Sequence, residues 1–165
     1  MKSAPRWIRV LIVAGCLMFI LALIVSAVFD PTIRVLHTLQ IIPYAAVIVL
    51  TRRDNAIGYG IGCLLAAFWN YLNLFVTTFI AAGMHQLGIL LRTGHLPRPD
   101  LLIAVDAALG HFLMIAGCLA GFLCMRPRRW PQFVAAGILS IGYLVAIIFL
   151  AGRQYIPLMH RVFHL

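Results

Sequence analysis

Negative charge is almost missing from this sequence. Its 165 residues contain no glutamate and only four aspartates: Asp30, Asp54, Asp100 and Asp106. Charged residues of both signs make up 10% of the chain, whereas a soluble domain has roughly 25%. So few carboxylates exclude most enzymes whose mechanism needs a pair of acidic side chains.

The short motifs of common enzyme classes are absent as well. The sequence has no GxSxG, HExxH or GxxxxGK[ST] pattern, which would indicate a serine hydrolase, a zinc protease or a nucleotide-binding loop. None of its three serines has a histidine beside it. The four cysteines form no CxxC pair and fall within apolar runs, where a thiol is a small and unreactive hydrophobic group: Cys16, Cys63, Cys118 and Cys124. These absences argue against an enzyme.

Apolar side chains dominate what is present. Hydrophobic residues make up 64% of the chain, against about 45–50% in a soluble domain, so the protein must be solvated by lipid. The formal net charge is +9, but the basic residues occur in short clusters between apolar runs. That distribution is typical of loops at a membrane surface and does not predict nucleic-acid binding.

Five apolar runs predict an all-α integral membrane bundle of about five transmembrane helices in a single domain. The first run has about twenty residues, which matches the ~30 Å hydrocarbon core. Its basic start and the triplet Val25-Ser26-Ala27 also resemble a signal peptide, but the length of the run favours an uncleaved helix. Residues 81–99 are predicted to be an outer loop or an interfacial segment. The expected spans are 8–29, 35–51, 56–80, 101–125 and 131–151.

The distribution of basic residues predicts the orientation. Eight lie on one side of the spans and five on the other, and the richer side should be cytoplasmic. We therefore expect a multi-pass protein of a bacterial inner membrane with a cytoplasmic N-terminus and an outside C-terminus. The eight are Lys2, Arg6, Arg9, Arg52, Arg53, Arg126, Arg128 and Arg129, and the five are Arg34, Arg92, Arg98, Arg153 and Arg161.

Small residues recur on two of the predicted helices. Lipid provides no hydrophobic drive for helices to associate, so close backbone approach through small side chains has to provide the contact. The third and fourth spans are therefore predicted to form the tightest pair. The stripes are Gly58, Gly62 and Ala66 on the third span, and Gly110, Gly117 and Gly121 on the fourth.

Polar residues gather in the predicted outer halves of three helices. An ionisable side chain within the hydrocarbon is costly, so it normally faces protein or a water-filled cavity. We predict a pocket that binds a small polar ligand or an ion, or that relays protons. The alternative is that Asp106 bonds Asn73 or Thr77 and only fixes helix packing. The candidates are His37, Gln40, Asn70, Asn73, Thr77, Asp106 and His111.

Two functional hypotheses follow. The first is a non-enzymatic accessory or assembly subunit of a membrane complex, or a small carrier, which meets lipid and other membrane subunits or copies of itself. No cofactor is predicted. The second is an electron-transfer subunit that binds b-type haem or a metal through neutral imidazoles. For this alternative the ligand candidates are His37, His85 and His111.

Overall fold

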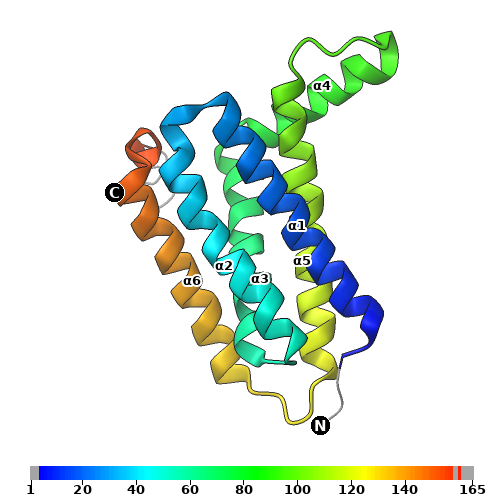
Figure 1. The fold of residues 1–165 in the computed structure, drawn as a ribbon, viewed down its shortest axis with the longest axis vertical. Coiled ribbons are helices and arrows are strands. Elements are labelled where there is room, and N and C mark those ends of the chain that lie inside the picture. The colour runs from blue at the N-terminus through cyan, green and yellow to red at the C-terminus, as the bar shows by residue number, and fades with distance from the viewer. Residues whose placement is uncertain (1–3, 158–159, 161–165) are drawn as a thin grey trace.

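The computed structural model describes residues 4–157 and 160, and these residues form helices and turns without any strand. Short 3₁₀ turns at Pro31–Ile33, Pro99–Leu102 and Arg153–Tyr155 connect or extend the main helices. Figure 1 shows the helices as an elongated bundle from which α4 projects at one end. The helices are α1 (Arg6–Phe29), α2 (Arg34–Arg52), α3 (Ala56–Tyr71), α4 (Phe79–Thr93), α5 (Ile103–Cys124) and α6 (Trp130–Ala151).

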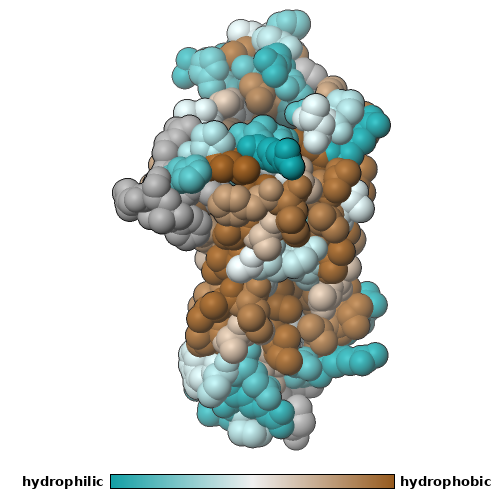
Figure 2. Space-filling view, turned by 90° about the vertical axis from the view of Figure 1, so that its left-hand side faces the viewer, coloured by the Kyte–Doolittle hydropathy of each residue, from teal (hydrophilic) through white to brown (hydrophobic). Residues whose placement is uncertain are grey.

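Within the described residues, five helices are long and apolar enough to cross a membrane. They are α1, α2, α3 with its continuation to Val76, α5 and α6. Figure 2 shows a broad hydrophobic belt between two hydrophilic ends of the molecule, as a chain surrounded by lipid requires. The prediction of an all-helical chain with about five candidate transmembrane helices is therefore confirmed.

The five long helices alternate in direction along the bundle (Figure 1). The turns after α2 and α5 lie at the end where α1 begins, and we call this the arginine end because it carries Arg52, Arg53 and Arg126. The opposite end, where α1 ends and α4 projects, is called the far end. At the centre α3 contacts α2, α5 and α6, while α5 also packs along α1.

The third candidate span ends before residue 80. After Tyr71 the helix widens into a π-helical turn, Leu72–Val76, in which the Thr77 amide donates to the Leu72 carbonyl at 2.8 Å. Thr77 is extended, with φ −108° and ψ 171°, and α4 starts anew at Phe79. Residues 81–99 are therefore mainly helical, and the segment 79–93 leaves the bundle as an α-helix of its own.

The glycines of α5 do not all face α3, so the prediction that the third and fourth spans form the tightest pair was wrong. The most extensive helix contact joins α1 and α5. A Cβ atom on Gly110 would lie 2.8 Å from the Gly15 carbonyl oxygen, and one on Gly117 would lie 2.7 Å from Ile12 Cγ1. Two α5 glycines therefore allow α1 to approach.

The stripe on α3 is also divided between neighbours. A Cβ on Gly62 would lie 2.5 Å from Cys118 Sγ on α5, whereas one on Gly58 would lie 2.5 Å from Leu50 Cβ on α2. The ring of Tyr59 packs directly against Gly121 of α5. Ala66 is fully buried. Because α3 is central, its small residues serve more than one neighbouring helix.

A proline in α2 leads to a polar link between two helices. Pro43 has no amide hydrogen, so it cannot donate to the carbonyl of Leu39 four residues earlier. The Tyr143 hydroxyl of α6 donates to this carbonyl instead, at 2.9 Å. In a lipid environment no water would replace the missing partner. Tyr143 therefore satisfies a carbonyl that the helix itself leaves free.

We expect Tyr143→Phe to destabilise the protein by about 1 kcal/mol, the usual net contribution of one hydrogen bond. Unfolding of the purified protein in detergent measures this loss. In a Pro43→Ala background the α2 amide returns, so the same Tyr143→Phe change should then cost clearly less. An equal cost in both backgrounds would contradict this account of the Leu39 carbonyl.

Candidate functional site

A cavity of about 380 Å³ lies within the bundle toward the far end. All six helices and the π-helical turn contribute to its lining, which is mostly apolar and includes Leu23, Leu36, Leu144 and Ile148. Ligand sites of small molecules are typically ~300–1,000 Å³ in volume and apolar, with a few placed polar groups. This cavity has the size and the lining of such a site.

His37 and Gln40 of α2 supply polar atoms to the cavity. His37 Nδ1 lies 3.0 Å from the Leu23 carbonyl oxygen. Because a carbonyl can only accept, Nδ1 carries a proton, and in the neutral imidazole Nε2 is then an acceptor. The Gln40 carboxamide makes no side-chain hydrogen bond within residues 4–157, although the residue is only 8% exposed. These two side chains have hydrogen-bonding capacity left for a ligand.

Asn73 and Thr77 also line the cavity, but they already bond to the nearby backbone and to each other. The Asn73 amide donates to the Trp69 carbonyl at 3.0 Å, and the Thr77 hydroxyl lies 3.2 Å from Asn73 Oδ1. The Phe79 amide then donates to Thr77 Oγ1 at 3.2 Å. These bonds stabilise the π-helical turn and the start of α4, so less of their capacity is free for a ligand.

One further hydroxyl at the cavity comes from Tyr155, in the turn after α6. Burial raises the pKa of Tyr155, and the negative charge of Asp30 raises it further. The phenol is therefore neutral at physiological pH and can donate a hydrogen bond. Tyr155 thus adds a hydroxyl donor to the cavity, beside His37 and Gln40.

His111 is completely buried and does not line the cavity. Its imidazole is enclosed by three aromatic rings: the ring centroids of Phe19, Trp69 and Tyr44 lie at 4.0, 4.6 and 5.6 Å. Phe19 and Trp69 also line the cavity, so they separate His111 from it. The Tyr44 hydroxyl lies 2.8 Å from His111 Nε2 and provides its hydrogen bond. The predicted polar residues thus form two layers: one lines the cavity, and a deeper one contains His111.

The deeper layer contains polar atoms without a partner. His111 Nδ1 and both side-chain atoms of Asn70 are buried and form no hydrogen bond within the described part of the chain. Burial of such an atom in an apolar environment costs about 1–3 kcal/mol. Buried polar groups are normally bonded to protein or to ordered water. We therefore expect water at Asn70 and His111 in the folded protein.

Asp106 belongs to neither layer. Ile103, Ala107 and His111 follow one another at intervals of four on one face of α5, and the first two line the cavity. Asp106 precedes Ala107 by one residue, which turns its side chain about 100° away from that face. It is half-buried and forms no hydrogen bond to Asn73 or Thr77, which bond to each other instead. The structure therefore places Asp106 outside the cavity.

Only His37 of the three histidines in the haem or metal hypothesis lines the cavity. His37 and His111 each have a hydrogen-bond partner, and His85 is exposed on α4. Among the described residues no group of three or more histidine, cysteine or acidic side chains could hold a metal ion. An absorption spectrum of the purified protein tests this hypothesis: a Soret band that His111→Ala abolishes would support it.

Sequence reasoning missed the aromatic part of the site. Phe19 lies in a long apolar run, and Trp69 directly precedes the polar face that begins at Asn70. An aromatic residue in a hydrophobic segment faces lipid or protein equally well. The helical spacing within one segment therefore gave no signal that these rings would enclose His111.

Comparison of the chain with protein-family models, curated proteins and solved structures found no match.

Proposed function

We propose that this chain is a multi-pass membrane protein that binds a small amphipathic molecule in the far-end cavity and serves as a carrier or as an accessory subunit that presents this molecule. The observation that carries the proposal is the 380 Å³ cavity, with His37 and Gln40 in its lining. Both side chains retain unused hydrogen-bonding atoms within a mostly apolar enclosure. That combination fixes the orientation of a ligand and provides specificity.

The lining favours one chemical class of ligand. A bare ion would need several converging oxygen or nitrogen ligands. Most of the lining is apolar, and Asn73 and Thr77 already bond to each other and to the backbone. A molecule with an apolar body and one or two hydrogen-bonding groups would bury its body against these side chains. Its polar group would meet Gln40, His37 Nε2 and the Tyr155 hydroxyl. The proposed ligand is therefore more apolar than the polar ligand or ion that the sequence suggests.

Filling the cavity should abolish ligand binding. Ala82 of α4 lines the cavity, so Ala82→Phe would place a ring in the ligand's volume, whereas the preceding Ala81 is exposed. We expect organic extracts of the purified wild-type protein to contain one small compound in near-stoichiometric amount by mass spectrometry. Ala82→Phe should lose this compound, and Ala81→Phe should retain it.

The amide of Gln40 should contribute to the affinity for the same ligand. Gln40→Leu preserves the approximate size of the side chain but removes its amide, and we expect about a tenfold lower affinity for the extracted compound, as for the loss of one hydrogen bond of about 1.4 kcal/mol. Wild-type extracts that contain only bulk phospholipid and detergent would contradict the proposed function. So would retention of the compound in Ala82→Phe.

The proposed orientation places the arginine end in the cytoplasm. Cysteine labelling from outside intact cells tests it at the turn after α5, with the native cysteines replaced. A cysteine at Arg128 should remain unlabelled, and one at Gly94 beyond α4 should react. The reverse labelling pattern would show that the orientation is opposite to the proposed one, and it would not affect the proposal for the cavity.

A further inference from the structure

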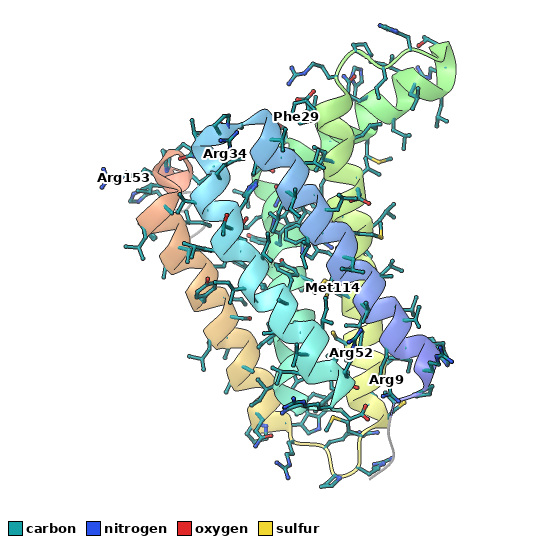
Figure 3. All side chains as sticks on the ribbon, in the orientation of Figure 1. Arg9, Phe29, Arg34, Arg52, Met114 and Arg153 are labelled. Carbon is teal, nitrogen blue, oxygen red and sulfur yellow. The ribbon has the colours of Figure 1, made fainter. Side chains whose placement is uncertain are left out.

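A second hollow lies at the opposite end of the bundle, on the surface between α1 and α2. It is a groove of about 590 Å³, lined by the side chains Arg6, Arg9, Val10, Val13, Ala14, Leu17 and Arg52. Its arginines lie at the arginine end, and its apolar residues continue along α1 toward the middle of the bundle. The eight residues from Val10 to Leu17 cover about 10 Å of helix length, measured from the first to the last. Figure 3 shows Arg9 of α1 and Arg52 of α2 near each other at this end.

The arginines of this groove lack acidic partners. Within residues 4–157 the salt bridge between Arg98 and Asp100 is the only one present, and it lies at the far end. Asp54, the acidic residue closest in sequence to Arg52, accepts hydrogen bonds from the Ala4 amide at 3.1 Å and the Tyr59 hydroxyl at 2.9 Å. No carboxylate of the described residues therefore forms a salt bridge with an arginine of the groove.

Arg9 provides a second and independent sign of a missing partner. Its Nη2 donates to the Ala4 carbonyl at 3.0 Å, which holds the guanidinium in place. Its Nε is buried and forms no hydrogen bond. A buried donor on a charged group is costly when it has no acceptor, and guanidinium groups pair with phosphate through two neighbouring N–H groups. An anion in the groove would meet the accessible part of the Arg9 guanidinium, which the Ala4 carbonyl already holds in place.

We propose that the groove binds one anionic phospholipid, with its phosphate at Arg6, Arg9 and Arg52 and an acyl chain along Val10, Val13, Ala14 and Leu17. Basic pockets between membrane helices are typical sites for anionic lipid headgroups. A soluble anion would use the arginines but not the apolar strip, whereas a phospholipid uses both. The order of the two regions also fits, because a headgroup lies at the membrane surface and its chain extends inward.

Native mass spectrometry of the purified protein with added phosphatidylglycerol or phosphatidylcholine tests the proposal. The wild type should retain phosphatidylglycerol at a lower lipid concentration than it retains phosphatidylcholine. The double variant Arg6→Gln/Arg52→Gln spares Arg9, which bonds to the backbone. Each basic residue near the surface strengthens anionic lipid binding about fivefold, so two predict roughly a 25-fold loss of affinity.

The matched control is Arg53→Gln/Arg126→Gln, which removes the same charge at the same end but outside the groove. It should keep most of the preference for phosphatidylglycerol. An equal loss in both double variants would overturn the proposal, because it would show only a general electrostatic effect. Equal retention of both lipids by the wild type, or capture of an acidic protein in place of lipid, would also overturn it.

A measurement on the wild type does not depend on the folding of any variant. Phosphatidylglycerol with a photoreactive diazirine on an acyl chain should crosslink chiefly to residues 10–17 in nanodiscs, and the phosphatidylcholine analogue should label the belt evenly. Even labelling by both lipids would overturn the proposal. Because the groove is separate from the far-end cavity, neither result depends on the ligand of that cavity.

Discussion

Gly15→Ala should lower the free energy of unfolding by about 3 kcal/mol. Its new Cβ would overlap the Gly110 carbonyl oxygen and would lie 2.8 Å from Met114 Cγ, so the backbones of α1 and α5 would have to separate. Overpacking of this kind typically costs ~1–3 kcal/mol, and a backbone atom yields less readily than a side chain. The separation would affect the most extensive helix contact in the bundle. Denaturant-induced or thermal unfolding in detergent measures the loss.

Gly142→Ala is the matched control for this prediction. Gly142 also lies in the middle of a helix, but a Cβ there would meet nothing within 4 Å. Alanine has the higher helix propensity, so this variant should be neutral or slightly more stable than the wild type. If Gly15→Ala were as stable as Gly142→Ala, α1 and α5 could not lie as close as the structure shows.

Tyr44→Phe should destabilise the protein by about 2 kcal/mol and leave its helix content unchanged. The variant keeps the ring that packs on Phe19 at a centroid distance of 4.5 Å but removes the hydroxyl that bonds His111 Nε2. Both imidazole nitrogens would then be buried without a partner in the described chain. Leaving a buried polar atom unsatisfied costs ~1–3 kcal/mol. Circular dichroism during thermal unfolding measures both quantities.

A double-mutant cycle identifies the interaction. In His111→Leu the imidazole is absent, so the additional change Tyr44→Phe should cost much less than it does in the wild type. Tyr71→Phe serves as a control, since Tyr71 lies on α3 with 47% of its surface exposed. Additive effects of the two substitutions would show that Tyr44 and His111 are not coupled. They would contradict the hydrogen bond that the structure shows beneath the cavity.

The candidate site was only partly accessible from sequence. His37, Gln40, Asn73 and Thr77 all line one cavity, and helical spacing already places the polar residues of each segment on a common face. Asp106 was assigned to this site only because it should lie at a similar depth in the membrane. Depth does not determine which way a side chain points around the helix axis. His111 shares a face of α5 with Ile103 and Ala107, which line the cavity, but it lies deeper, behind Phe19 and Trp69.

The helix pairing illustrates the same limit. A stripe of small residues indicates that another helix approaches closely, but it does not identify which helix that is. Gly110 and Gly117 meet α1 because α5 lies between α1 and α3 and offers glycines to both. The π-helical turn before Thr77 was also unpredictable, since its hydrogen bonds use the side chains of Asn73 and Thr77 in a local arrangement.

The helical character of the chain and its five candidate transmembrane segments follow from the sequence, because hydrophobic length and the positions of proline and arginine are local properties. The folded bundle was needed to show which helices touch, which polar residues share the cavity and which ones bond elsewhere. The rotation and order of helices depend on packing between segments that are distant in sequence. Tyr143 shows this plainly: its partner is the Leu39 carbonyl, 104 residues away.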